Sequence, residues 1–110
     1  MSGIIIRSKS FKAWMLANFD PDQLSDIASH GADAGWHGLI YYTDTCKLYQ
    51  RFKSEIWEML LEDAESLGQN VFEMIANFGR AKDVGSADQF ENLMTWYAAE
   101  RIAREETDSN

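Results

Sequence analysis

The sequence predicts an all-α fold, a compact single-domain bundle of five or six helices. Apolar residues recur at intervals of three and four along most of the chain, residues that favour helix ends flank these segments, and no segment shows the sustained alternation of a strand. The 110 residues contain one proline and no low-complexity linker. We therefore expect one helical domain over 1–110, with residues 1–9 as a lead-in and 106–110 as a frayed tail.

Two short helices are expected near the start of the chain. The first covers residues 10–17. The second follows Asp20, a residue suited to the N-cap, has Pro21 at its first position, and ends before Gly31. The side chains expected to face inward from these helices are Phe11, Trp14, Met15, Leu24, Ile27 and Ala28.

A Gly- and aromatic-rich connecting loop at about 31–42 comes next. Thr43 or Asp44 can then cap a long helical region that reaches Leu67 and is closed by a glycine. The apolar pattern shifts near Ser54, so this region is either one helix or two, with Ser54 as a second cap. Its expected inward side chains are Leu48, Tyr49, Phe52, Ile56, Leu60, Ala64 and Leu67.

Two further helices complete the expected bundle. Residues 70–78 read as a short buried helix that Gly79 ends, followed by a polar loop. Ser86 and Gln89 form a capping box for the last helix, which runs to about Glu105. The expected inward side chains are Val71, Phe72, Ile75, Phe78, Phe90, Leu93, Met94 and Tyr97.

Charge is divided unevenly along the chain, whose net charge is −8. Residues 1–53 carry six Lys or Arg against five acids, whereas residues 54–110 carry four bases against thirteen acids. This balance disfavours direct binding of nucleic acid and favours a basic partner, unless the charge serves solubility alone. No signal peptide or membrane span is visible, and the single cysteine, Cys46, suits a reducing cytoplasm, where it is expected to pack as a small hydrophobe.

The stretch HGADAGWHGLIYYTDT holds both histidines of the chain. His30, Asp33, His37 and Asp44 are residue types that could serve a small metal-binding or hydrolytic enzyme, which is one alternative. Their spacing matches no zinc or protease motif, and the helix dipole accounts for His30 at a helix end. We therefore favour a packed connection and predict no catalytic residue, metal or cofactor; in the alternative, exposed Trp36 and His37 are secondary partner contacts.

An acidic stripe is predicted on the long middle helix. Glu55, Glu58, Glu62 and Glu65 are spaced three, four and three residues apart, which places them along one side of a helix, with Asp63 beside them. No Lys or Arg lies among them to form the usual helical ion pairs. The stripe is therefore the candidate partner-binding site, able to mimic a phosphate backbone; the alternative is an ordinary solvated face.

The stretch HGADAGWHGLIYYTDT, followed by SEIWEMLLEDAESLG, resembles a group of small acidic proteins encoded by bacterial phages and plasmids. Proteins of that kind often counter host defence, as anti-CRISPR proteins do when they occupy nucleic-acid-binding surfaces. The resemblance implies an inhibitor in the bacterial cytoplasm that binds a basic surface of a host protein or ribonucleoprotein, and it carries over no functional residues. The motifs of acidic antirestriction proteins are absent. A homodimeric interaction module is a further alternative.

Overall fold

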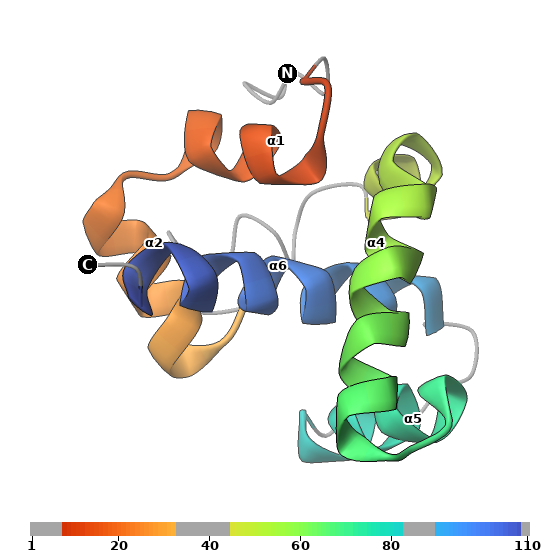
Figure 1. Cartoon of the computed structure of the whole chain (residues 1–110). Helices are drawn as coiled ribbons and strands as arrows, with labels where there is room; N and C mark the ends of the chain where they lie inside the picture. The colour runs from red at the N-terminus through yellow and green to blue at the C-terminus, as the bar shows by residue number, and fades with distance from the viewer. Residues whose placement is uncertain (1–7, 33–44, 83–89, 109–110) are drawn as a thin grey trace.

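The computed structural model describes residues 8–32, 45–82 and 90–108 of the chain. Over these ranges the protein is all-α, as the sequence predicts, with five helices and no strand (Figure 1). The helices are α1 (Phe11–Asn18), α2 (Pro21–His30), α4 (Thr45–Leu67), α5 (Val71–Ala81) and α6 (Phe90–Asp108).

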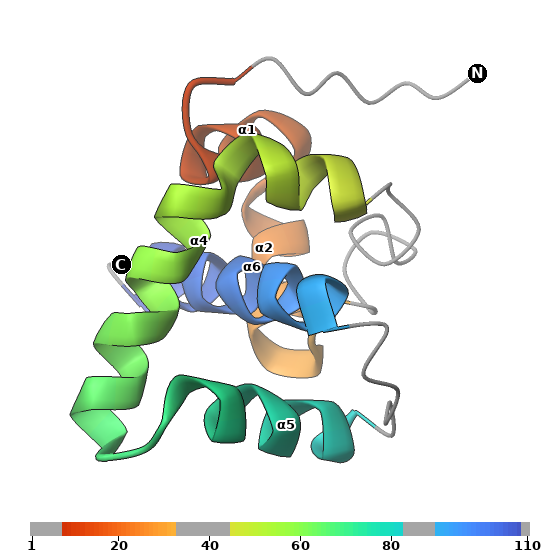
Figure 2. The ribbon, with the colours of Figure 1, turned by 90° about the vertical axis from the view of Figure 1, so that its right-hand side faces the viewer.

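Helix α6 forms the centre of the molecule. It contacts each of the four other helices, and in Figure 2 it runs between α1 at one end of the molecule and α5 at the other. Its buried residues occupy all sides of the helix, as expected for a helix surrounded by others. The radius of gyration of 13.1 Å equals that of a compact chain of this length, about 13 Å.

The predicted start of α2 is confirmed. The Asp20 side chain accepts a hydrogen bond from the Gln23 N–H at 2.8 Å, and the Gln23 side chain accepts one from the Asp20 N–H, so the two form a capping box. Gly31 follows the helix with a φ of 101°, a conformation that favours glycine. The predicted core side chains Leu24 and Ile27 are buried, whereas Ala28 is only partly buried.

Helix α4 consists of two helical segments joined at a kink, as the alternative with two helices expects, although the kink falls before Ser54. Phe52 has non-helical angles (φ −119°, ψ 24°), two residues before the Ser54 expected to begin a second helix. The helix ends in the expected glycine: Gly68 has a φ of 67°, and the Gln69 N–H bonds the Ala64 carbonyl at 2.9 Å. The kink separates an N-terminal part from the part that carries the acidic residues.

The expected burial of Leu67 and Phe72 is wrong, since these side chains are 60% and 55% exposed. Leu67 lies in the last turn of α4, and Phe72 follows the buried Val71 on the flank of α5. The expected end of α5 at Gly79 is also wrong. Gly79 is buried within the helix, which continues to Ala81, because one glycine costs a helix only about 1 kcal/mol relative to alanine.

The last helix is longer than expected. It passes Glu105 and ends at Asp108, so the part of the expected frayed tail that the structure describes is helical. Thr107 donates a hydrogen bond to the Ala103 carbonyl at 3.0 Å, and Glu106 pairs with Lys12 of α1 at 3.2 Å. The hydrogen bond lies within the last turns of α6, and the ion pair joins the end of α6 to the first helix.

Several predictions concern parts of the chain that lie outside the described residues: the loop beyond Ala32, including Trp36 and His37, and the capping box of Ser86 and Gln89. Among the helices that are described, none is long and apolar enough to cross a membrane.

Candidate functional site

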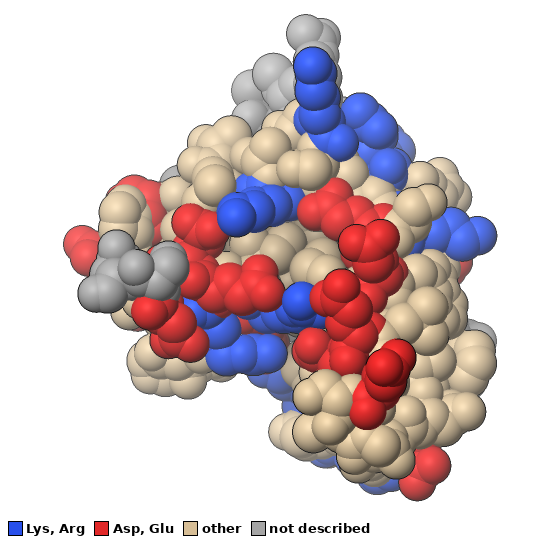
Figure 3. Space-filling view, viewed as in Figure 1, with Lys and Arg blue, Asp and Glu red and all other residues tan. Residues whose placement is uncertain are grey.

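The acidic stripe lies on α4, after the kink, as the sequence predicts. Figure 3 shows acidic side chains gathered along this helix, with basic side chains to one side of them and uncharged surface to the other. The structure separates the five predicted site residues into two sets: some carboxylates hold the fold together, and others face solvent.

Glu55 caps helix α1. Its Oε1 accepts a hydrogen bond from the Phe11 N–H at 2.7 Å, and its Oε2 accepts one from the Lys12 N–H at 3.2 Å. These donors belong to the first turn of α1, where backbone N–H groups lack helical partners and the dipole favours a negative charge. The N-cap Ser10 satisfies the N–H of Ala13. Glu55 is half-buried, and its carboxylate is engaged by the backbone of α1.

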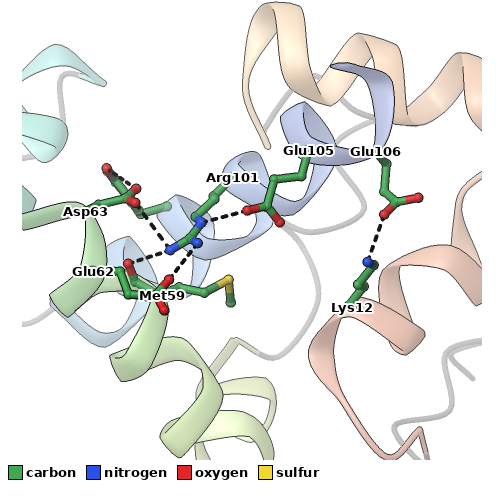
Figure 4. Close-up of polar contacts among 8 residues, drawn as sticks. Lys12, Met59, Glu62, Asp63, Arg101, Glu105 and Glu106 are labelled. Carbon is green, nitrogen blue, oxygen red and sulfur yellow. Dashed lines mark hydrogen bonds and ion pairs between the residues drawn. The ribbon is translucent and has the colours of Figure 1, made fainter. Parts of the chain in front are cut away.

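Arg101 of α6 pairs with two further carboxylates of the site, Glu62 and Asp63 (Figure 4). Its guanidinium bonds Glu62 at 2.7 Å and lies 3.2 Å from an oxygen of Asp63. It also donates to the Met59 carbonyl at 2.7 Å and to Glu105 at 3.1 Å. This fork joins α6 to the acidic part of α4 and fixes the orientation of that helix.

Asp63 has a second partner. The Tyr97 hydroxyl donates to its Oδ2 at 2.8 Å. Burial, this hydrogen bond and the negative charge of Asp63 raise the pKa of Tyr97 to about 12. For Arg101, burial lowers the pKa, but the hydrogen bonds to Glu62 and Glu105 outweigh it, so the pKa of Arg101 lies above its ordinary value.

Glu58 and Glu65, here called the outer pair, are the remaining members of the stripe. Both are exposed, and neither has a hydrogen bond or ion pair with another residue that the structure describes. Glu62 keeps a 58% exposed side chain despite its bond to Arg101. The charge available to a partner therefore comes from the outer pair and from Glu62, while Glu55 and Asp63 are engaged within the protein.

Sequence reasoning missed a buried carboxylate on the central helix. Glu100 is 8% exposed, and its Oε2 accepts a hydrogen bond from the Ala32 N–H at 3.0 Å and pairs with the Lys82 ammonium at 2.8 Å. It thus ties the ends of α2 and α5 to α6. A signal was present: Glu100 stands seven residues after Leu93 and four after Trp96, in line with buried positions.

Of the candidate metal or hydrolytic site, only His30 falls within the described residues. It is exposed in the last turn of α2, while Asp33, His37 and Asp44 lie outside them. Among the described residues, no group of three His, Cys, Asp or Glu could hold a metal ion. The prediction that Cys46 packs as a small hydrophobe is wrong, because this residue is exposed in the first turn of α4, 3.9 Å from Glu91.

Fold and surface together define a small all-α domain, built around one central helix, that displays carboxylates on α4. The chain belongs to the DUF7222 family, a domain of unknown function whose model matches residues 8–109. Comparisons with curated proteins and with solved structures gave no match.

Proposed function

We propose that this protein is a binding protein without enzymatic activity, an inhibitor of the anti-CRISPR-like kind encoded by a phage or mobile element. It acts in the bacterial cytoplasm by occupying a basic, nucleic-acid-binding surface of a host defence complex. The observation that carries the proposal is the row of exposed carboxylates Glu58, Glu62 and Glu65 on α4, in a segment without Lys or Arg.

Rigid presentation supports this function. Glu58 and Glu62 are one helical turn apart, and Glu62 and Glu65 nearly so, which is unfavourable for like charges by a few tenths of a kcal/mol. Arg101 relieves only part of this repulsion, because it contacts one edge of the stripe. A basic partner relieves the remaining repulsion between these carboxylates. Because α4 already holds the carboxylates in position, little conformational entropy is lost when the partner binds.

The test is reversal of the outer pair. Glu58→Lys with Glu65→Lys is expected to abolish inhibition without unfolding the protein, since both side chains are exposed and make no described contact. Asp26→Lys with Asp108→Lys adds the same charge change of four units at exposed positions on α2 and α6, and is expected to leave inhibition intact. The readout is survival of a targeted plasmid in bacteria with an active CRISPR system that express each variant.

Two outcomes would count against the proposal. If the outer-pair variant protects the plasmid as well as the parent protein does, α4 is not the binding face. If the parent protein protects nothing across the defence systems tested, the inhibitor function itself is wrong. Where protection occurs, binding of the purified protein to the affected complex should weaken as salt rises.

A further inference from the structure

A second feature of α4 lies beside the outer pair. Leu61 is 52% exposed, and Trp57, one turn before it, is half-buried. The Trp57 ring meets the ring of Phe72 from α5 edge to face, with centroids 5.8 Å apart. We call Trp57, Leu61 and Phe72 the apolar patch. Clustered exposed apolar side chains of this kind mark interaction surfaces more often than single ones do.

The apolar patch is held in place by the fold. The Trp57 indole N–H donates to the Tyr49 hydroxyl at 2.8 Å. Phe72 also stacks on Phe90 of α6, with centroids 5.7 Å apart. The rings of the apolar patch are therefore ordered before a partner binds, which lowers the conformational entropy lost on binding.

The apolar patch and the outer pair form neighbouring rows along α4. At about 100° per residue, Trp57 and Leu61 lie on one line of the helix, and Glu58 and Glu65 lie about 60–80° around from it. A partner that covers this part of α4 meets apolar side chains and unpaired carboxylates together. The matching surface has an apolar row next to a basic row.

We infer that the apolar patch and the outer pair together bind the apolar-and-basic face of an amphipathic helix in a partner protein. The inference rests on the proposed function and names the chemistry of the partner at that site. A helix fits because it presents two parallel rows at intervals of three and four residues. Leu61 and Phe72 supply the apolar contact, and the outer pair selects Lys or Arg beside it.

A second copy of the chain fits this surface poorly. In a two-fold contact the same surface meets itself, so the outer pair of one copy would lie close to the outer pair of the other. Four carboxylates with no Lys or Arg in the same segment of α4 would then be brought together. Charge complementarity therefore favours a basic partner over self-association.

The experiment uses the full chain and a synthetic helical peptide of Leu and Lys, with Leu at i, i+3, i+4 and i+7 and Lys beside them. Fluorescence anisotropy gives its Kd, and a scrambled peptide of the same composition is the control. The designed peptide is expected to bind at least tenfold more tightly than the scrambled one. Equal affinity for the two peptides would overturn the inference, because charge alone would then account for binding.

Variants of the protein separate the two rows. Leu61→Ala is expected to raise the Kd of the peptide about tenfold. Leu16→Ala, which shortens a leucine that is 44% exposed on α1, is the control and should change Kd less than about twofold. Glu58→Gln with Glu65→Gln is expected to weaken binding and to reduce its dependence on salt. Phe72→Ala adds a third measurement, with urea unfolding run alongside because its ring also packs against Phe90.

The failures are distinguishable. If Leu61→Ala binds normally and the Gln variant does not, the inference is overturned while the acidic binding face of the proposed function stands. If only Leu61→Ala weakens binding, both the basic partner and the acidic face are wrong. If sedimentation shows a dimer that Leu61→Ala dissociates, the occupant is a second copy and the inference is overturned.

Discussion

Replacement of Glu55 by alanine separates the structural part of the acidic stripe from its exposed part. The carboxylate bonds two N–H groups in the first turn of α1, one at 2.7 Å and one at 3.2 Å. Truncation leaves both donors without this acceptor and removes a negative charge from the positive end of the helix dipole. We expect α1 to dock less tightly on α4.

The magnitude follows from the two bonds. A hydrogen bond to a charged group contributes about 1.5–3 kcal/mol; we assign about 1.5 kcal/mol to the shorter bond and about 0.5 kcal/mol to the longer, exposed one. Glu55→Ala should therefore lower the free energy of unfolding by about 2 kcal/mol, or the Tm by about 10 °C for a domain of this size. Glu55→Gln should cost less, because its amide oxygen can still accept one of the two bonds.

Urea unfolding, followed by circular dichroism, measures the effect. Glu58→Ala is the matched control: it removes the same side chain three residues away on the same helix, where it is exposed, and should change stability by less than about 0.5 kcal/mol. If the two alanine variants unfold at the same urea concentration, Glu55 does not cap α1 and the division of the stripe is wrong.

Three further predictions concern α6. Arg101→Lys should lower the free energy of unfolding by about 2 kcal/mol, because lysine cannot reproduce the guanidinium fork; Arg104→Lys, at an exposed position, should have almost no effect in the same urea assay. Stability should fall as pH rises from 10 towards about 12, because the pKa of Tyr97 is about 12 in the folded protein and 10 when unfolded; Tyr97→Phe should remove this alkaline loss, measured by thermal unfolding across the pH range. Lys82→Met should destabilise the protein by about 3 kcal/mol, since it leaves the buried Glu100 carboxylate without its cation, and Glu100→Gln with Lys82→Met should recover part of this loss in a double-mutant cycle.

Helix positions could be predicted wherever a local rule decides them. The capping box at Asp20 and the glycine that follows α4 depend on neighbouring residues alone, and both are confirmed. Gly79 has the same local signal, yet α5 continues through it, because packing against α6 outweighs a cost of about 1 kcal/mol. The exposure of Leu67 could not be predicted from the sequence either, because it depends on where the other helices end.

The candidate site could be placed on the correct helix but not resolved into roles. Spacing alone puts Glu55 and Glu58 on the same side of α4 and gives them equal standing. The residue that distinguishes them, Phe11, lies 44 positions before Glu55, and Arg101, which engages Glu62 in the same stripe, lies 39 positions after it. Only the packing of α1 and α6 against α4 brings these groups together.

The geometry of α4 explains why the stripe divides into carboxylates engaged by other helices and carboxylates exposed to solvent. At about 100° per residue, Glu55 and Glu62 lie within about 20° of each other around the helix, as do Glu58 and Glu65, and the two pairs lie about 60° apart. Helices α1 and α6 reach the first pair, through the N-terminus of α1 and through Arg101, and leave the second pair to solvent. Substitution of Glu55 should therefore change stability alone, substitution of Glu62 should change both stability and binding, and substitutions in the outer pair should change binding alone.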